Sequence, residues 1–250
     1  MEIQIAIAKT NRYGSPESGD TLEVIERPGG GLSAVLCDGK SSTHEAKLIS
    51  GMVVRKVLGL IADGVRDGAA ARAASDFLYI EKNGKYSVFL NILSADLQTG
   101  TIVLTRNNPT PIFIAQADRI ECLPGGSEAI GQSRNFRPAI TEIGLSGGTT
   151  VVMYTDGLLQ AGTRNGGLGL DICAVLEAIL EEMNPTAQFI ADSLLNQAVR
   201  LDAGRPGDDI SVVVLRILEG KDFDPIRRMI VIMPISREGT LRFSSEDALD

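Results

Sequence analysis

Apolar and polar residues alternate near the start of the chain. Residues 3–7 carry isoleucine at every second position, and a similar alternation returns over residues 22–25. A period of two places the apolar side chains on one face of an extended chain, so both segments are predicted to be strands with one buried face. Residues 32–37 form the next apolar run. The proline- and glycine-rich residues 28–31 before it predict a hairpin turn.

From Ser42 the pattern changes to a helical one. Apolar residues recur at spacings of three and four over residues 48–60, and Ser42 with Glu45 has the spacing of a capping box. We therefore expect a long helix that begins a few residues after Asp38. Residues 67–78 are rich in alanine and predict a second, shorter helix.

Strand patterns return in the second half of the chain. These predicted strands are residues 86–93, 101–104, 111–115, 119–122, 139–143 and 149–154. Residues 169–182 and 185–200 predict a helix pair, with Pro185 in the first turn of the second helix. Residues 210–217 form a closing strand. Strands, two helices, a long antiparallel meander, two helices and a last strand predict an α+β sandwich of sheets covered by helices.

Composition narrows the choice of partners. The chain has 250 residues, of which 44% are hydrophobic, and this is enough for a sizeable core. Its formal net charge is −8 without any basic block, which argues against nucleic acid or an anionic membrane as the main partner. No stretch reaches the ~18 apolar residues of a membrane helix, and the first residues do not resemble a signal peptide. We expect a cytoplasmic protein.

Zinc is a poor candidate as a cofactor. The three cysteines, Cys37, Cys122 and Cys173, have no paired spacing, and His44 is the single histidine. Each cysteine is expected to be a small buried residue in a reducing compartment.

Aspartates next to glycines recur at the ends of predicted strands. The motifs are Ser18-Gly19-Asp20, Asp38-Gly39, Thr155-Asp156-Gly157 and Gly207-Asp208-Asp209. A lone Asp-Gly is usually a plain turn, as at Asp63-Gly64, but here two motifs end apolar strands and one begins a strand. The fold could bring these carboxylates to one edge. Such oxygens suit Mg²⁺ or Mn²⁺, and two ions about 3.5–4 Å apart can activate a water and clamp a phosphoryl group.

The order of these motifs resembles the metal-dependent PPM-type serine/threonine phosphatases, specifically the bacterial SpoIIE, RsbU and RsbX branch. Three intervening segments agree with the family pattern. Asn107-Asn108-Pro109-Thr110-Pro111 resembles the family's Asn-Ala-Gly-His-Pro-Pro segment. Ala129-Ile130-Gly131 resembles its Pro-Leu-Gly segment. Glu45-Ala46-Lys47 resembles the start of the family's first helix. The likeness covers residues 3–217, and the compact size is most similar to RsbX.

The resemblance implies a four-layer α-β-β-α sandwich, with two antiparallel sheets flanked by helix pairs. It also implies two Mn or Mg ions, held by Asp20, Asp38, the Gly39 carbonyl, Asp156 and Asp208. Asp209 would orient this cluster or serve as a further ligand. The implied reaction is hydrolysis of phosphoserine or phosphothreonine by a metal-bound water, with a phosphorylated STAS-domain protein of a stressosome or anti-sigma-factor switch as substrate.

One loop departs from the family. The family usually has a glycine-rich loop after Asp38-Gly39, whereas this chain has Lys40-Ser41-Ser42-Thr43. Lys40 and His44 are candidate substrate contacts, although a solvated lysine and an exposed histidine in a first helical turn are the commoner interpretations. The altered loop leaves a second hypothesis open, a pseudophosphatase that binds a phosphorylated partner. A hydrolase of a small phosphorylated metabolite is a third.

The end of the chain is harder to interpret. We predict a phosphatase domain over residues 1–217 and an extension over residues 218–250. Within the extension, residues 229–233 are apolar and could add one strand, whereas residues 244–250 are polar and are expected to be a mobile end.

Overall fold

The computed structural model describes residues 1–40, 43–117, 119–125, 128–182, 184–220 and 225–234, and these residues contain two antiparallel five-stranded sheets. In spatial order, the first sheet consists of β1 (Glu2–Thr10), β10 (Ile210–Leu218), β9 (Thr150–Tyr154), β6 (Ile112–Gln116) and β7 (Arg119–Leu123). The second consists of β2 (Thr21–Glu26), β3 (Gly31–Gly39), β4 (Val88–Asp96), β5 (Thr101–Asn107) and β8 (Ala139–Gly144). The expected α+β class is confirmed.

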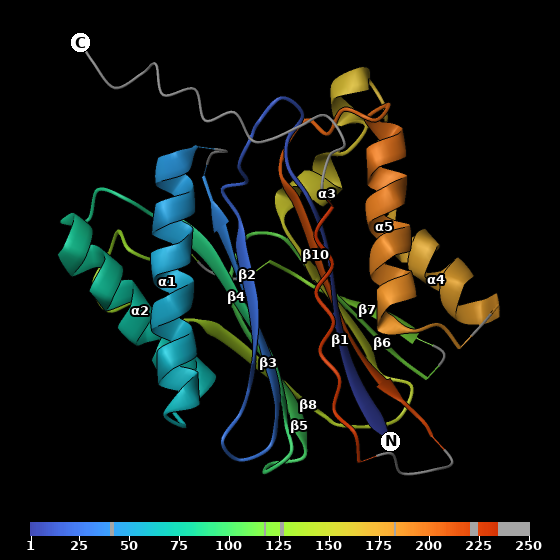
Figure 1. The fold of residues 1–250 in the computed structure, drawn as a ribbon, viewed down its shortest axis with the longest axis horizontal. Coiled ribbons are helices and arrows are strands. Elements are labelled where there is room, and N and C mark those ends of the chain that lie inside the picture. The colour runs from blue at the N-terminus through green and yellow to red at the C-terminus, as the bar shows by residue number, and fades with distance from the viewer. Residues whose placement is uncertain (41–42, 118, 126–127, 183, 221–224, 235–250) are drawn as a thin grey trace.

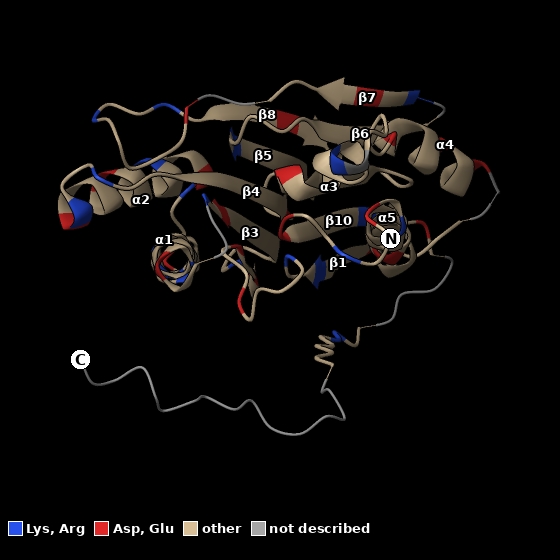
Figure 2. Ribbon diagram, turned by 90° about the horizontal axis from the view of Figure 1, so that it is seen from above, with Lys and Arg blue, Asp and Glu red and all other residues tan. Residues whose placement is uncertain are grey.

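Helices cover the outer faces of both sheets. The α-helices are α1 (His44–Ala62), α2 (Asp67–Lys82), α3 (Asp156–Gln160), α4 (Ile172–Glu182) and α5 (Ala187–Leu201), and a short 3₁₀ helix spans Thr163–Asn165. The pair α1 and α2 lies on the second sheet and the pair α4 and α5 on the first (Figure 1). Seen from above, the two helix pairs flank the two sheets (Figure 2).

Three apolar cores hold these layers together. One lies between the sheets, and each of the other two lies between a sheet and its helices. Strand β3 shows how the sequence serves both sides, because Leu36 faces the other sheet while Val35 and Cys37 face α1 and α2. A strand buried on both faces requires a continuous apolar run rather than an alternation, and residues 34–37 provide one.

Two helix starts differ from the predictions. Ser42 lies outside the described residues, and the N-cap of α1 is Thr43, whose hydroxyl accepts the Ala46 N–H at 3.2 Å. Pro185 precedes α5 rather than lying in its first turn, because Thr186 is the cap and accepts the Phe189 N–H at 3.2 Å. In both helices a threonine hydroxyl satisfies a backbone donor that the first turn leaves open.

The asparagine segment after β5 does not form a hairpin turn. Strand β5 belongs to the second sheet and β6 to the first, so residues 108–111 cross between the sheets. The Asn108 side chain accepts the Thr110 N–H at 2.9 Å, and the Thr110 hydroxyl donates to the Tyr154 carbonyl at 3.2 Å. The crossing is thereby tied to the end of β9.

Two further expectations need correction. Cys122 is exposed because β7 is an edge strand, whereas Cys37 is buried as expected and Cys173 is partly buried. Residues 225–234 form neither helix nor strand, so the added strand expected at 229–233 is not formed there. Its five apolar side chains are instead 69–87% exposed. Residues 244–250 lie outside the described part of the chain.

A membrane-crossing helix is absent from the described residues, since none of their helices combines the necessary length and apolar character.

Candidate metal centre

The β2–β3 hairpin places two of the predicted carboxylates next to each other. Asp20 directly precedes β2, and Asp38 is the penultimate residue of β3. The register pairs Thr21 with Cys37, so the two aspartates are neighbours across the hairpin. Both are buried, with exposed fractions of 2% for Asp20 and 8% for Asp38.

The β9–β10 pair brings two more carboxylates to the same end of the sandwich. Asp156 follows β9 and begins α3, and Asp208 lies just before β10. The Thr155 N–H donates to the Ser211 carbonyl at 3.0 Å and extends the strand pair. The Ser211 hydroxyl then donates to Asp20 Oδ2 at 2.7 Å. This hydrogen bond joins the two sheets where the aspartates gather.

Asp209 holds the loop between β1 and β2. Its two carboxylate oxygens accept the backbone N–H groups of Arg12 and Gly19, each at 2.8 Å. Asp209 is buried, and Gly19 is the residue directly before Asp20. Through these contacts Asp209 can orient Asp20, which is the role that the family resemblance implies.

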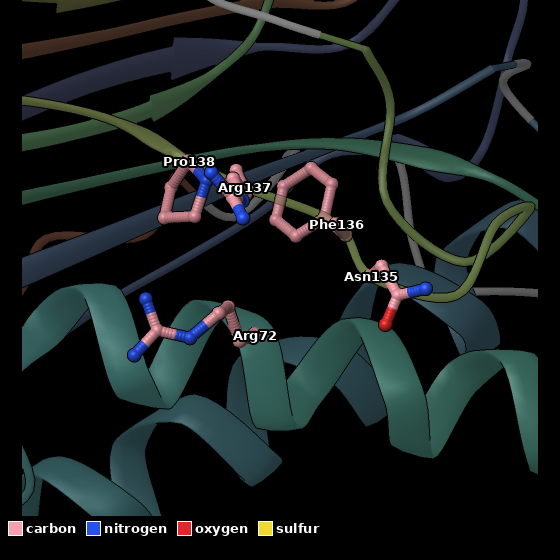
Figure 3. Close-up of a pocket in the computed structure, with 5 residues that line it drawn as sticks. All are labelled: Arg72, Asn135, Phe136, Arg137 and Pro138. Carbon is pink, nitrogen blue, oxygen red and sulfur yellow. The ribbon is translucent and has the colours of Figure 1, made fainter.

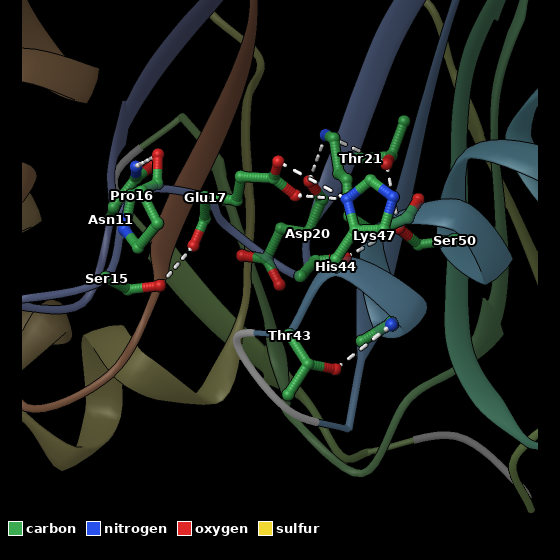
Figure 4. Close-up of polar contacts among 12 residues, drawn as sticks. Asn11, Ser15, Pro16, Glu17, Asp20, Thr21, Thr43, His44, Lys47 and Ser50 are labelled. Atoms are coloured by element: carbon green, nitrogen blue, oxygen red, sulfur yellow. Dashed lines mark hydrogen bonds and ion pairs between the residues drawn. The ribbon is translucent and has the colours of Figure 1, made fainter. Parts of the chain in front are cut away.

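Two ammonium groups lie against the backbone of Asp20. Lys9 Nζ donates to the Asp20 carbonyl at 2.7 Å. Lys47 Nζ donates to the same carbonyl at 2.8 Å (Figure 4). Lys47 also donates to the Thr21 hydroxyl at 3.1 Å. That hydroxyl shares a 2.8 Å hydrogen bond with the Ser50 hydroxyl. Burial and the neighbouring Lys47 lower the pKa of Lys9. These cations partly offset the negative charge of the aspartates.

The other aspartates act electrostatically on Asp38. Burial raises the pKa of this carboxyl group to about 9. The charges of four other residues add to this shift, namely Asp20, Asp156, Asp208 and Asp209. Burial likewise raises the pKa of Asp20 to about 6, and burial together with Asp208 raises the pKa of Asp156. Carboxylates from both strand pairs thus act electrostatically on Asp38.

The convergence does not amount to a cage made only of side chains. Within the described ranges, no three Asp, Glu, His or Cys side chains form a ready-made metal-binding group. Mg²⁺ and Mn²⁺ nevertheless do not require such a cage, since they often take one or two carboxylates and complete an octahedral shell with water. The hard oxygen donors and the accumulated negative charge fit such an ion. The donors available are Asp20, Asp38, the Gly39 carbonyl, Asp156 and Asp208.

The glycines beside the aspartates allow close backbone approach. A Cβ atom at Gly39 would lie 2.8 Å from the Gly19 carbonyl oxygen and 3.1 Å from the Ala46 Cβ. A Cβ atom at Gly157 would overlap the Asp209 carbonyl oxygen. A larger residue at either position would push the strand ends apart.

The candidate substrate contacts Lys40 and His44 lie at the edge of this region. His44 is the first residue of α1, its side chain is 72% exposed, and its Nδ1 lies 3.0 Å from a Glu17 carboxylate oxygen (Figure 4). Lys40 is exposed, and its Nζ lies 6.0 Å from the centre of the Phe89 ring. Their roles as substrate contacts remain predictions.

Sequence reasoning did not single out Lys9, Ser211 or Arg164. Arg164 Nη2 lies 3.7 Å from Asp208 Oδ2. A signal for Lys9 was present, because the alternation of residues 3–7 places it on the same strand face as the isoleucines, between the sheets. Ser211 and Arg164 gave no such signal, since their partners are distant in sequence.

Known proteins share this fold. The chain is 22% identical over 215 residues to stage II sporulation protein E of Bacillus subtilis, covering 86% of this chain but only 26% of that protein. The solved PP2C phosphatase domain of the Bacillus subtilis protein, with a fragment of its regulatory domain, has a TM-score of 0.75 at 21% identity, covering 87% of this chain and 64% of that one. RsbX in complex with magnesium has a TM-score of 0.64 at 14% identity, covering 85% and 94%. The chain thus spans about a quarter of the curated relative, and the structures establish a shared PP2C fold.

The family model described as stage II sporulation protein E matches residues 28–218. This match includes Asp38, Asp156 and Asp208, and only Asp20 of the four converging aspartates lies before it. Most of the chain is covered, and the fold agrees. The chain belongs to the stage II sporulation protein E (SpoIIE) family.

Proposed function

We propose that this chain is a metal-dependent phosphatase that hydrolyses phosphoserine or phosphothreonine on a bacterial regulatory protein. The observation that carries the proposal is the convergence of Asp20, Asp38, Asp156 and Asp208 from two sheets at one end of the sandwich. Family membership supports it independently. Lys9 and Lys47 offset only part of the charge of these carboxylates, two of which are buried, and a divalent cation is the simplest group that offsets the rest.

Some residues would hold two Mn or Mg ions, and others fix the positions of those metal-binding residues. The ions would be held by Asp20, Asp38, the Gly39 carbonyl, Asp156 and Asp208. When bound, they would supply Lewis acidity toward the phosphoryl oxygens and lower the pKa of a water.

The chain's own contribution is to fix the positions of these donors. Ser211 holds the Asp20 carboxylate, Lys9 and Lys47 hold its carbonyl, and Asp209 holds the preceding loop. In the net reaction the bond between phosphorus and the serine or threonine oxygen breaks, water oxygen bonds to phosphorus, and the freed hydroxyl takes a proton. Prepositioned donors favour this reaction because little reorganisation remains.

For the substrate we propose a phosphorylated STAS-domain protein. Solved structures that share this fold include part of a chain with RsbU and RsbW domains from Mycobacterium tuberculosis, of which this chain covers 60%, and a protein described from the bacterial stressosome. The stressosome is a regulatory system, and the resemblance to the RsbX branch supports the same class of substrate. The net charge of −8 supports a protein substrate over nucleic acid.

The test is hydrolysis of an aryl phosphate and of a phosphorylated STAS-domain protein, with Mn²⁺ or with chelator. Wild type should release phosphate only with metal, and Asp38→Asn should lose most of that activity. Asp76→Asn, an exposed change on α2, should keep it. Turnover that survives chelation would contradict the proposal. Tight binding of the phosphoprotein without any release of phosphate would instead support the pseudophosphatase, which the changed residues after Gly39 favour.

A further inference from the structure

A hollow of about 630 Å³ lies beside the acidic strand ends. Three arginines line it, and each comes from a different segment. Arg12 lies in the loop between β1 and β2, Arg164 in the short 3₁₀ helix, and Arg205 in the loop between α5 and β10. The other lining residues are Tyr13, Asp202, Ala203, Pro206 and Gly207. None of the proposed metal ligands is among them, but Gly207 directly precedes Asp208.

Defined contacts assemble the wall of the hollow. The Tyr13 N–H donates to the Pro206 carbonyl at 2.8 Å, and the Arg205 guanidinium lies 5.4 Å from the centre of the Tyr13 ring. Asp202 is buried and accepts the N–H groups of Gly162 at 2.7 Å and Gly207 at 3.0 Å. The carboxylate of Asp202, the acidic residue in the lining, therefore accepts hydrogen bonds from the backbone and does not pair with the arginines of the hollow.

The three guanidinium groups differ in their acidic partners. Arg164 is engaged with the Gly207 carbonyl and with Asp208. Across the described parts of the chain, no Asp or Glu forms an ion pair with Arg12 or Arg205. Two positive charges thus face a hollow at the edge of a strongly negative cluster, in a chain whose net charge is −8. The two arginines favour an anionic group within the hollow.

We propose that this hollow binds acidic side chains flanking the phosphorylated serine or threonine of the protein substrate. The inference rests on the proposed function and specifies its substrate. Guanidinium groups bind carboxylates through paired hydrogen bonds, and the volume is in the range of about 300–1,000 Å³ of small-molecule pockets, which is room for more than one side chain. Because the hollow adjoins the proposed metal ligands without containing them, it suits a flanking residue rather than the phosphate that is hydrolysed.

A second arginine-lined hollow provides a matched control. It has about 610 Å³ and lies between α2 and residues 135–138 (Figure 3). Arg72 on α2 and Arg137 line it, as do Asn135, Phe136 and Pro138. None of its lining residues belongs to the strand ends that carry the aspartates. Arg72→Gln therefore removes an exposed arginine from a comparable hollow outside the proposed substrate path.

The experiment compares two phosphothreonine peptides that differ only in flanking residues, Asp and Glu in one, Asn and Gln in the other. We expect wild type to prefer the acidic peptide in kcat/KM. Arg12→Gln and Arg205→Gln should each reduce that preference by about tenfold, the worth of one charge-assisted hydrogen bond. Arg72→Gln should leave the preference unchanged. Thermal unfolding of each variant identifies any loss of folding.

A binding measurement separates this inference from the proposed function. Fluorescence anisotropy with the Asp38→Asn protein reports peptide affinity without turnover, and the acidic peptide should bind tighter than the neutral one. Adding Arg205→Gln to Asp38→Asn should reduce that difference by about tenfold. If wild type hydrolyses nothing but these affinities hold, the catalytic proposal fails and the hollow stands. Equal losses on both peptides and on an aryl phosphate would mean that the arginines hold the reacting phosphate, which would overturn the inference. Arg12 and Arg205 variants indistinguishable from Arg72→Gln would also overturn it.

Discussion

Asp209 accepts the backbone N–H of Gly19 at 2.8 Å although 190 positions separate the two residues. The same carboxylate accepts the Arg12 N–H, so one buried side chain ties the loop before Asp20 to the start of β10. The loop therefore depends on a residue from the far end of the domain. Loss of this contact should displace Asp20 more than other residues.

Replacing Asp209 by Asn should lower the free energy of unfolding by about 1–3 kcal/mol, because the amide cannot accept both N–H groups. Urea unfolding followed by circular dichroism measures this change. Asp76→Asn removes an exposed carboxylate from α2 and should change stability by less than about 0.5 kcal/mol. Equal stability of the two variants would show that the Asp209 contacts contribute nothing.

Divalent cations should stabilise the folded protein. Binding that offsets the charge around Asp38 adds about 2.7 kcal/mol when the metal is at about one hundred times its dissociation constant. Differential scanning calorimetry with Mn²⁺ and with chelator gives the shift in Tm.

Asp38→Asn should separate this effect from general stability. Burial and the neighbouring aspartates raise the pKa of Asp38, so its ionised form opposes folding near neutral pH. The variant should thus be more stable than wild type in chelator and should lose most of the Mn²⁺-induced shift. A variant that kept the full shift would exclude Asp38 as a ligand.

Gly157→Ala should destabilise the protein by about 1–3 kcal/mol, because the added methyl group would overlap the Asp209 carbonyl oxygen. Gly59→Ala is the matched change. Gly59 lies within α1, and a methyl group added there would meet no described atom within 4 Å beyond its own stretch of helix. Alanine at this position should therefore stabilise the helix by about 0.5–1 kcal/mol. Chemical unfolding of both variants tests the opposite signs.

A buried ion-pair network lies away from the proposed centre. Arg27 is 2.7 Å from Asp67 and 3.2 Å from Asp96, and the Asp67 side chain is only 2% exposed. Arg27→Met should cost about 3–5 kcal/mol, because it leaves Asp67 buried without its cation. The exposed pair of Arg119 with Glu121 provides the contrast, and Arg119→Gln should cost less than about 1 kcal/mol. Thermal unfolding measures the stability of the two variants. Equal stability of the two would contradict this expectation.

We also propose that residues 1–217 fold as the phosphatase domain without the extension. The described residues 225–234 add no strand, and their ion pair from Arg227 to Glu26 is exposed. Such a pair is worth about 0–1 kcal/mol, so a chain ending at Gly220 should keep its Tm within about 4 °C. A larger loss would show that the extension belongs to the fold. Removal of five exposed apolar residues should also reduce self-association in light scattering.

Much of the fold could be predicted because its signals are local. The alternation of apolar and polar residues predicted β1 and β2, and the glycine-rich turn before β3 predicted the hairpin. The aspartates at strand ends predicted the candidate metal centre. The resemblance to a family added the sheet arrangement, which periodicity alone does not specify. Local patterns do not reveal which distant strands pair.

The misses share one physical cause, which is dependence on distant partners. Asn108 has turn chemistry, but its segment crosses between sheets because β6 pairs with β9 rather than with β5. Cys122 has apolar neighbours, yet its strand ends up at an edge. Arg12 and Arg205 look like ordinary loop residues until the fold places them around one hollow. Tertiary context decides each of these outcomes.

The pairing of β1 with β10 has a consequence for the order of events during synthesis. Residues 2–10 leave the ribosome well before their hydrogen-bonding partners, residues 210–218. The β2–β3 hairpin, with Asp20 and Asp38, can form early, whereas the strand pair that supplies Asp156 and Asp208 must wait. Long-range pairings of this kind slow folding and leave an apolar strand edge open in the meantime. Nascent chains should therefore acquire metal affinity only after β10 has emerged.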